Sequence, residues 1–353
     1  MKKITLRQNL ILELIRKKGK ASNREIRKYL EEKLESPDRT TIVREIDFLL
    51  KADLILKEGA GRSVAYREKI ANPMLAYFDP QKYFEIESDK REILFSNFNF
   101  QVFQNFSKTL FMPDELSDLD KKNDEYRKNM ESLPETILRK EFERLTIELS
   151  WKSSQIEGNT YSLLDTEFLI KKNQEAQGHT KEEALMILNH KDALDYILKN
   201  KNDFRKISLA KIENIHKLLV KEINIKENIR QRAVGITGTK FRPIDNEFQI
   251  REALEKMMDI INDEKNHPLL KALASVLLIS YIQPFEDGNK RTARLIGNAI
   301  LLANNYCPLS YRSVDEKDYK KAILLFYEQN SALFFKEIFL EQFEFSIDNY
   351  FLE

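Results

Sequence analysis

The scarcity of glycine is the feature that most constrains what this chain can fold into. Only nine of its 353 residues are glycine, whereas average usage would give roughly 25. The chain is instead rich in Leu, Ile, Glu and Lys, a composition that favours helices. We therefore predict a mainly α fold. The remaining glycines, among them Gly158, Gly235, Gly238 and Gly288, then mark places where the backbone needs conformational freedom.

Charge and cysteine counts exclude several classes of protein. There are 58 Lys and Arg against 57 Asp and Glu, so the formal net charge is only +1, which argues against a uniformly basic nucleic-acid coat. A single cysteine, Cys307, excludes an intrachain disulfide framework and cysteine-based metal sites. The first residues lack the pattern of a signal peptide, and the longest apolar run, 272–282, is too short to span a bilayer. We therefore expect a cytoplasmic protein with no membrane partner.

The first seventy residues form a basic segment that differs from the rest of the chain. They hold 18 Lys and Arg and 11 Asp and Glu, a net charge of +7, which leaves −6 for the remainder. Capping and apolar patterns predict helices over 6–18, 22–34 and 36–51, the last with Ser36-Pro37 at its start. A strand–turn–strand signal follows around Gly59-Ala60-Gly61. We thus predict a domain over 1–70.

This order of elements resembles a winged helix-turn-helix domain. The third helix of such a domain enters the major groove of DNA. The DNA-binding candidates on that helix and on the wing are Arg39, Thr40, Thr41, Arg44 and Arg62. A protein-interaction module with solvated charged faces is the alternative reading of the same residues.

Residues 71–134 are less regular, and we expect a linker or helical region there. The spacing of Phe95, Phe98, Val102, Phe103 and Phe106 suits one face of a helix, so ordinary helix packing is favoured over a stacking platform for bases. The acidic stretch 114–125 is typical of a loop. Helix-forming patterns then dominate from 135 onwards, which defines a third region over 135–353.

The segment Tyr281-Ile-Gln-Pro-Phe-Glu-Asp-Gly-Asn-Lys-Arg-Thr-Ala-Arg294 carries the strongest chemical signal. A loop with Gly288 and Asn289 opens onto a helix, where free backbone N–H groups and the helix dipole favour an anion. Arg291 and Arg294 are three residues apart and can hold a polyphosphate with their guanidinium forks. Asp287 supplies a hard oxygen ligand suited to Mg²⁺. From this chemistry we predict a magnesium–nucleotide site.

The segment also resembles the signature of the Fic (filamentation induced by cAMP) family, His-Pro-Phe-x-Asp/Glu-Gly-Asn-Gly/Lys-Arg-x-x-Arg. The resemblance implies a helical Fic-type domain that transfers AMP from ATP to a hydroxyl side chain of a target protein. It implies that Asp287 binds Mg²⁺ and that Gly288, Asn289 and Lys290 form an anion hole. Arg291 and Arg294 would then hold the outer phosphates.

One position departs from this family pattern. Gln283 stands where the signature has its general-base histidine. A carboxamide does not titrate near neutral pH, and the loss of a general base typically lowers a rate by about 10²–10⁴. Nucleotide binding is therefore expected to persist, whereas efficient AMP transfer is in question.

Two further segments resemble elements of the same family. Ser153-Ser-Gln-Ile-Glu157-Gly158 resembles the Fic inhibitory motif, which implies that the Glu157 carboxylate reaches Arg294 and takes the place of the ATP γ-phosphate. Residues 236–243, including Thr239, Lys240 and Phe241, resemble the family's flap, which aligns a target as an added strand. We expect a short β-hairpin there.

These observations favour an autoinhibited protein adenylyltransferase that uses ATP and Mg²⁺ on an unidentified target protein. One alternative is a catalytically weak nucleotide-binding regulator that acts on DNA or a protein through residues 1–70. Another is removal of AMP from targets, with Glu157 orienting a water molecule. The sequence leaves open whether the protein is a monomer or a homodimer.

Overall fold

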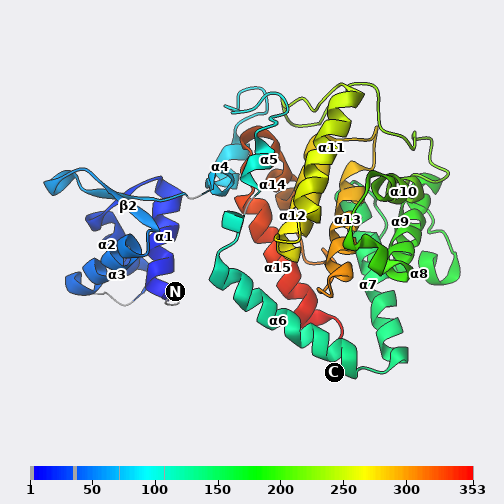
Figure 1. Cartoon of the computed structure of the whole chain (residues 1–353), viewed down its shortest axis with the longest axis horizontal. Helices are drawn as coiled ribbons and strands as arrows, with labels where there is room; N and C mark the ends of the chain where they lie inside the picture. The colour runs from blue at the N-terminus through cyan, green and yellow to red at the C-terminus, as the bar shows by residue number, and fades with distance from the viewer. Residues whose placement is uncertain (1–3, 35–37, 71, 107, 353) are drawn as a thin grey trace.

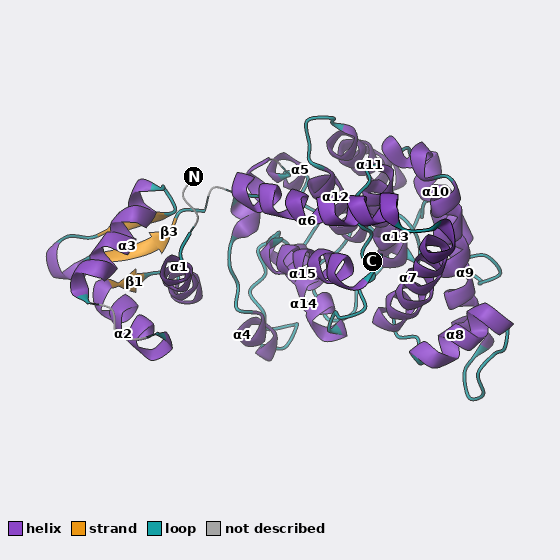
Figure 2. Ribbon diagram, turned by 90° about the horizontal axis from the view of Figure 1, so that it is seen from below, coloured by secondary structure: helices purple, strands orange, loops and turns teal. Residues whose placement is uncertain are grey.

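The computed structural model describes residues 4–352 apart from 35–37, 71 and 107, and it shows a mainly helical molecule with two lobes (Figure 1). A small lobe at the N-terminus carries the only sheet among the described residues, and a larger lobe is built from helices (Figure 2). The predicted mainly α fold is confirmed.

The small lobe has three helices and a three-stranded antiparallel sheet in the order β1-β3-β2. A core of twelve buried side chains, centred on Ile11, Ile46 and Tyr66, holds these elements together. The elements are α1 (Leu6–Lys18), β1 (Ala21–Ser22), α2 (Asn23–Lys33), α3 (Arg39–Lys51), β2 (Ile55–Glu58) and β3 (Ala65–Glu68).

Local capping explains where the helices of the small lobe begin. Thr5 and Ser22 form capping boxes with Gln8 and Glu25 at the starts of α1 and α2. The predicted cap of the third helix was wrong, because Asp38 fills that position and accepts hydrogen bonds from the N–H groups of Thr40 and Thr41. Ser36 and Pro37 lie outside the described residues.

The larger lobe is organised around two central helices, α12 (Pro268–Ile282) and α13 (Asn289–Ala303). Every side chain from Leu269 to Ile282 is buried, so α12 is surrounded by protein on all sides. Gly297 permits close packing of the pair, because a Cβ atom there would lie 2.8 Å from Val276 Cγ2. This packing fixes the loop that joins the two helices, residues 283–288, at one end of the core.

The other helices of the larger lobe surround this pair, some in direct contact with it and others packed on those helices (Figure 1). They are α4 (Pro80–Glu85), α5 (Val102–Asn105), α6 (Pro113–Ser132), α7 (Glu135–Ile156), α8 (Leu163–Lys172), α9 (Lys181–Lys199), α10 (Leu209–Leu219), α11 (Glu247–Asn262), α14 (Glu316–Gln329) and α15 (Leu333–Asn349). Short 3₁₀ turns lie at Gly61–Ser63, Pro73–Leu75, Lys108–Leu110 and Lys201–Arg205.

Two expectations for residues 71–134 were wrong. The stretch 114–125 is not a loop but part of α6, because Pro113 starts the helix and Leu119, Asn123 and Tyr126 form a buried stripe on it. The aromatic segment is not a continuous helix, since only 102–105 are α-helical. Its side chains nevertheless pack into the main core, so this region is an integral part of the larger lobe rather than a linker.

The expected β-hairpin over 236–243 is also absent from the structure. Among the described residues of this segment the only strand-like pairing is a single parallel bridge between Arg242 and Asn97. The chain makes a turn at Gly238, where φ is 83°, and is otherwise irregular. The β-forming residues are used differently here, because the Phe241 ring turns inward and stacks on Tyr281 instead of lying along a strand.

Candidate functional site

The loop between α12 and α13 forms an open helix start. Gln283 and Gly288 take left-handed backbone conformations, with φ of 52° and 77°, and so reverse the chain within six residues. The first backbone bond of α13 runs from Thr292 N–H to Gly288 O, and no side chain caps the helix. The N–H groups of Asn289, Lys290 and Arg291 therefore remain for an anion, and the helix dipole favours one there.

Two buried arginines lie beside this helix start. Arg291 is 2% exposed and Arg294 is fully buried. Their Nη1 atoms have no hydrogen-bond partner within the described part of the chain. Since a buried donor without a partner is costly, two such guanidinium nitrogens fit a site that receives oxygen atoms from a ligand.

Glu157 already occupies part of this site. Helix α7 ends just before it, and Gly158, with φ of 102°, turns the chain away. The Glu157 carboxylate accepts hydrogen bonds from Arg294 Nη2 at 2.9 Å and from Lys290 Nζ at 3.2 Å. Arg294 also donates to Oγ and O of Ser153, at 2.9 and 2.8 Å. The contact expected from the inhibitory motif is therefore present.

The charges at this contact determine the ionisation of Glu157. Burial alone would raise the pKa of Glu157, but Arg294 and Lys290 outweigh burial and hold that pKa below its ordinary value of 4.5. The carboxylate is therefore ionised at neutral pH and forms a true ion pair with the arginine.

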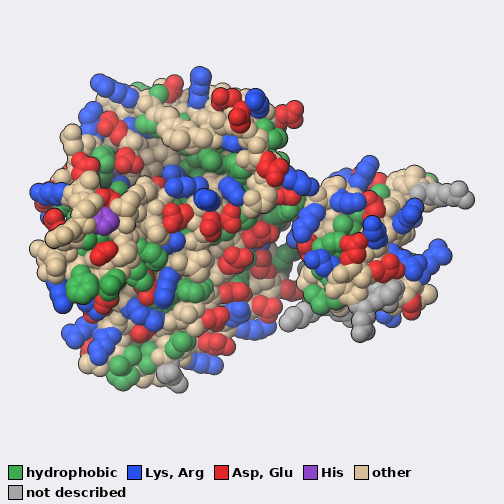
Figure 3. Space-filling model, turned by 180° about the vertical axis from the view of Figure 1, so that it is seen from behind, with side chains coloured by type: hydrophobic (Ala, Val, Ile, Leu, Met, Phe, Trp, Pro, Cys, Tyr) green, Lys and Arg blue, Asp and Glu red, His purple; other side chains and the backbone are tan. Residues whose placement is uncertain are grey.

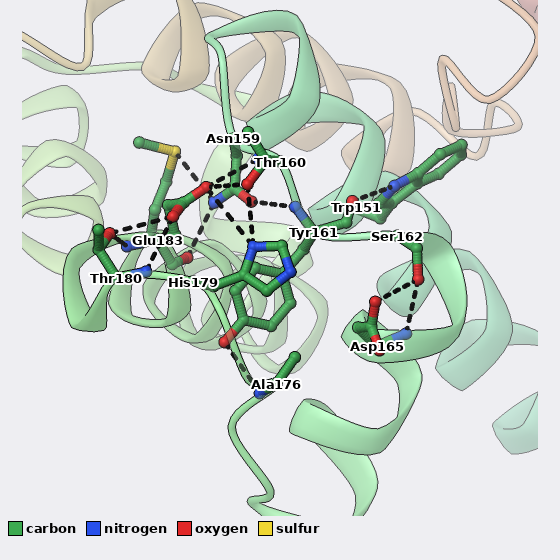
Figure 4. A network of polar contacts seen from close by, with 11 residues as sticks. Trp151, Asn159, Thr160, Tyr161, Ser162, Asp165, Ala176, His179, Thr180 and Glu183 are labelled. Atoms are coloured by element: carbon green, nitrogen blue, oxygen red, sulfur yellow. Dashed lines mark hydrogen bonds and ion pairs between the residues drawn. The ribbon is translucent and has the colours of Figure 1, made fainter.

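A polar clamp fixes the loop that follows Glu157 (Figure 4). Thr160 donates to Glu183 Oε1 from both its N–H, at 2.9 Å, and its hydroxyl, at 2.6 Å, while Asn159 Nδ2 donates to Glu183 O. His179 Nδ1 lies 2.9 Å from Thr160 Oγ1. The hydroxyl bond from Thr160 and N–H bonds from Thr180 and Thr160 lower the pKa of Glu183 to about 2. The sequence analysis missed this clamp.

The Asn289 side chain bonds within the loop. Its Oδ1 accepts from Phe285 N–H at 2.8 Å, and its Nδ2 donates to Phe285 O at 2.8 Å and to Gln283 Oε1 at 3.0 Å. The side chain therefore holds the loop together, and only the backbone N–H faces the anion position.

Gln283 is held firmly within the same loop. It is 9% exposed, and its Nε2 donates to Ser280 O at 2.6 Å and to the Tyr327 hydroxyl at 3.3 Å. With its Oε1 accepting from Asn289, both ends of the carboxamide are engaged. The amide supports the loop, but it offers no group that could accept a proton.

His216 supports the loop from below. Its ring stacks on the buried Phe285 ring at 3.6 Å, and its nitrogens lie 3.0 Å from Asp287 O and 3.1 Å from Glu227 O. Burial lowers the pKa of His216. Gly288 lies against this ring: a Cβ atom at that position would be 3.5 Å from the His216 ring.

Asp287 presents an exposed carboxylate at the end of the loop. Its side chain is 67% exposed, and its Oδ2 lies 3.7 Å from Arg291 Nη2. Within the described residues no group of three or more His, Cys, Asp or Glu side chains could hold a metal ion by itself. A single carboxylate fits an ion that retains most of its water and bridges phosphates, as Mg²⁺ does.

The flap residues divide between the core and the surface. Phe241 is buried against Tyr281 and Tyr327, so it anchors the segment and is not available to a target. Lys240 is exposed, and its ammonium donates to the carbonyls of Asp89 and Arg91. Thr239 is half-buried and accepts from Phe241 N–H.

Arg230 was missed by the sequence analysis, where it is one basic residue in a basic run. Its buried guanidinium donates to Gln283 O at 2.6 Å, to Arg232 O at 2.7 Å and to Ile244 O. Burial lowers the pKa of Arg230 to about 10. It ties the residues on both sides of the flap to the loop 283–288, hereafter the signature loop.

Three of the DNA-binding candidates come together on the small lobe. Arg39, Thr40 and Arg44 line an open groove of about 590 Å³ on the outer face of α3. Thr41 is half-buried outside that groove. Arg62 lies in the 3₁₀ turn of the wing, and its side chain is outside the described part of the structure.

The sequence of the larger lobe is similar to known proteins. Residues 206–301 match the model of the Fic/DOC family. The chain is 30% identical over 210 residues to protein adenylyltransferase Fic of Nematostella vectensis, a match covering 56% of this chain and 48% of that protein. It is 28% identical over 161 residues to protein adenylyltransferase fic-1 of Caenorhabditis elegans, covering 44% of this chain and 31% of that protein.

Solved structures show the same fold. A fragment of Fic-1 from C. elegans superimposes with a TM-score of 0.58 and 22% identity, covering 66% of this chain and 70% of that chain. A Fic domain containing signaling protein from Bacteroides thetaiotaomicron gives a TM-score of 0.58 and 21% identity, covering 65% and 94%. The larger lobe therefore has the Fic fold.

Residues 206–301 accordingly form a Fic/DOC family domain. This domain contains α10 to α12 and most of α13, and so includes Gln283, Asp287 and both arginines. The chain spans about a third to a half of the length of these curated relatives. In the described part of the chain, no helix has the length and apolarity needed to cross a membrane.

Proposed function

We propose that this protein transfers AMP from ATP to a hydroxyl group of a target protein, and that Glu157 restrains the reaction. The single observation that carries the proposal is the Glu157 carboxylate bound to Arg294 at an otherwise uncapped helix start. An acidic group from another helix already occupies a site whose donors suit an anion. The naming of similar proteins as adenylyltransferases supports the same activity.

The residues of the loop have distinct parts in this proposal. The N–H groups at the start of α13 hold the phosphates next to the reacting phosphorus, while Arg291 and Arg294 bind the outer ones. The target hydroxyl oxygen forms a bond to the α-phosphorus, the bond to the pyrophosphate oxygen breaks, and the hydroxyl proton passes to a base. Gln283 cannot take that proton, so solvent accepts it and the reaction is slow.

A divalent ion fits this site through one ligand. Asp287 would hold Mg²⁺, which when bound neutralises phosphate charge. The carboxylate is exposed at the mouth of the loop, where a nucleotide-bound ion can reach it. The protein residues, not a preformed metal cage, set the position of the phosphates.

Restraint by Glu157 follows from competition for one guanidinium group. While Arg294 Nη2 donates to Glu157 Oε1, the same nitrogen is not available to a phosphate oxygen. ATP can then bind only weakly or with its phosphates misplaced, and misplacement of the reacting group is enough to suppress transfer.

The test is labelling of the protein itself with ATP that carries the radioactive phosphorus at the α position. We expect Glu157→Gly to incorporate label with Mg²⁺ present and the intact chain to incorporate much less. Glu222→Gly is the matched control, since Glu222 is exposed and has a φ of 59° that glycine tolerates.

The position of the radioactive phosphorus identifies the group transferred. Label from the α position and none from the γ position would show transfer of AMP. Label from the γ position would indicate a kinase reaction instead. Absence of any label in Glu157→Gly, despite ATP binding, would contradict the proposed activity.

A second function is favoured by the small lobe and by Gln283 together. Three helices with a sheet of order β1-β3-β2, and basic side chains along the α3 groove, suit a winged-helix module that binds DNA. The engaged carboxamide of Gln283 suits a site that binds nucleotide without rapid turnover. On this reading, the protein is a nucleotide-dependent regulator whose output is DNA binding.

A further inference from the structure

A buried ion pair outside the matched Fic/DOC residues holds the turn of the flap. Arg91 is 5% exposed and Glu328, on α14, is fully buried. Arg91 donates to Glu328 from Nη2 at 2.8 Å and from Nε at 3.1 Å, and the same Nη2 donates to Gly238 O at 2.5 Å. One guanidinium group therefore joins the flap turn to the helical core.

The segment that carries Arg91 also lies along one side of the flap. Lys240 Nζ donates to Asp89 O at 3.1 Å and to Arg91 O at 3.0 Å. Further along, Arg242 N–H donates to Ser96 O at 2.9 Å. These ties occupy one side of the flap with residues 89–97 of the same chain.

Helix α14 gives the flap and the signature loop a common support. The Glu328 backbone carbonyl accepts from both Leu94 and Phe95 N–H, each at 3.0 Å. The preceding side chain, Tyr327, donates to Ser280 O and accepts from Gln283 Nε2. Adjacent residues of one helix thus set the flap and position 283 relative to each other.

We propose that Arg91 is a positioning residue for the target: it fixes the flap turn at Gly238 relative to Gln283, so that the partly exposed stretch 233–238 is already ordered when it meets a target segment. This inference rests on the proposed AMP transfer. Without the tie, the flap becomes ordered only when the target binds. The loss of conformational entropy then weakens target binding. Among the described residues Arg91 and Glu328 bond to neither Arg291 nor Arg294, so the nucleotide site keeps its contacts.

The experiment compares paired substitutions in the full chain, in a Glu157→Gly/Gln283→His background. Removal of Arg91 alone would leave Glu328 buried and unpaired, so the test variant is Arg91→Met/Glu328→Gln, which removes both charges. The control is Tyr83→Phe, which removes the 2.7 Å bond from Tyr83 to Glu328 but leaves Arg91 on Gly238. The probe is a library of short peptides that contain Ser, Thr or Tyr.

We expect the paired variant to raise the apparent KM for the peptide library by about tenfold or more, with kcat within about twofold, because only target binding carries the ordering cost. ATP affinity measured by calorimetry should not change, and Tyr83→Phe should behave like the background. An unchanged peptide KM would overturn the inference. So would a rise in peptide KM that is matched by an equal fall in ATP affinity.

Failure of the proposed activity would be recognisable separately. If the background itself labels no peptide, the AMP-transfer proposal fails, and amide hydrogen exchange then decides whether the tie exists. Faster exchange of the Leu94, Phe95 and Arg242 amides in the paired variant, but not in Tyr83→Phe, would show that the Arg91–Glu328 tie holds the flap. Equal exchange in all forms would overturn it.

Discussion

Among the individual side chains, Glu157 has the clearest effect on the state of the site. Its carboxylate holds Arg294, which has no other acidic partner among the described residues. Glu157 reaches this position because α7 ends one residue earlier and Gly158 turns the chain away. The presence or absence of this one carboxylate therefore decides whether Arg294 Nη2 is occupied or available to a phosphate oxygen.

Glu157→Gly should bind Mg²⁺-ATP more tightly than the intact chain, because Arg294 becomes available to the phosphates. Calorimetric titration with ATP measures the difference. Glu222→Gly should retain the affinity of the intact chain. Equal affinity in all three proteins would remove the inhibitory role of Glu157.

The ion pair also predicts a pH dependence of stability. The folded-state pKa of Glu157 is lowered below 4.5, so the ionised carboxylate stabilises the fold above that pH, and the contribution is lost as the pH falls through the lowered pKa. Glu157→Gln should therefore lower the free energy of unfolding at pH 7. The difference from the intact chain should shrink below about pH 4.5 in urea titrations. A difference that grows on acidification would contradict the assignment.

Restoring histidine tests whether the missing base limits the reaction. In a Glu157→Gly background, Gln283→His should raise labelling by about 10²–10⁴, because it supplies a group that accepts the hydroxyl proton. Histidine tolerates the left-handed φ at this position better than most residues. Gln283→Ala, which loses the amide contacts without adding a base, should give no gain. ATP affinity should change little in Gln283→His.

Among whole elements, the start of α9 has a function that its own sequence does not reveal. Glu183 completes the capping box of Thr180 at that helix, as a local motif should. The same carboxylate receives the hydroxyl and N–H of Thr160 from the loop after α7. Glu183, a capping residue of α9, therefore fixes the loop that follows α7. Because Glu157 stands at the start of that loop, Glu183 also helps to hold its carboxylate in place.

Glu183→Ala should accordingly weaken the restraint as well as the helix. Loss of its hydrogen bonds should lower the free energy of unfolding by about 1 kcal/mol and raise ATP affinity part of the way towards that of Glu157→Gly. Glu182→Ala is the control, since Glu182 is the exposed neighbour in the same helical turn. A loss of stability without any change in ATP affinity would show that the clamp does not act on Glu157.

Across the whole molecule, the two lobes differ in charge as well as in fold. Lys and Arg side chains are spread over the face of the small lobe seen in Figure 3, with acidic side chains among them. The charge of residues 1–70 is +7 against −6 for the rest. The α3 groove lies on the small lobe, so a nucleic-acid partner would bind away from the nucleotide site.

If the small lobe binds DNA, the affinity should fall steeply with salt, because phosphate contacts release counterions. Arg39→Ala and Arg44→Ala should each weaken binding in gel shifts with a genomic fragment library and reduce the salt slope by about one. Arg27→Ala is the control, as Arg27 lies on α2 and pairs with Glu31. Absence of binding even at low salt would leave a protein-interaction module.

The sequence by itself determined the features that depend on near neighbours. Low glycine content and capping residues specified the helices, and a run of fourteen residues placed Gly288, Asp287 and both arginines at one helix start. Residues within one turn of each other meet whenever the helix forms. The family resemblance, rather than the residues alone, anticipated that Glu157 would reach Arg294.

Only the tertiary structure decided the features that join distant segments. Phe241 is not part of a hairpin because its ring packs against the buried rings of Tyr281 and Tyr327. The acidic α6 became a helix because one stripe of it packs on the core. Arg91 meets Glu328 across 237 positions of sequence. The free energy of such contacts comes from burial against partners that no local pattern contains, so packing overrides local propensity at these positions.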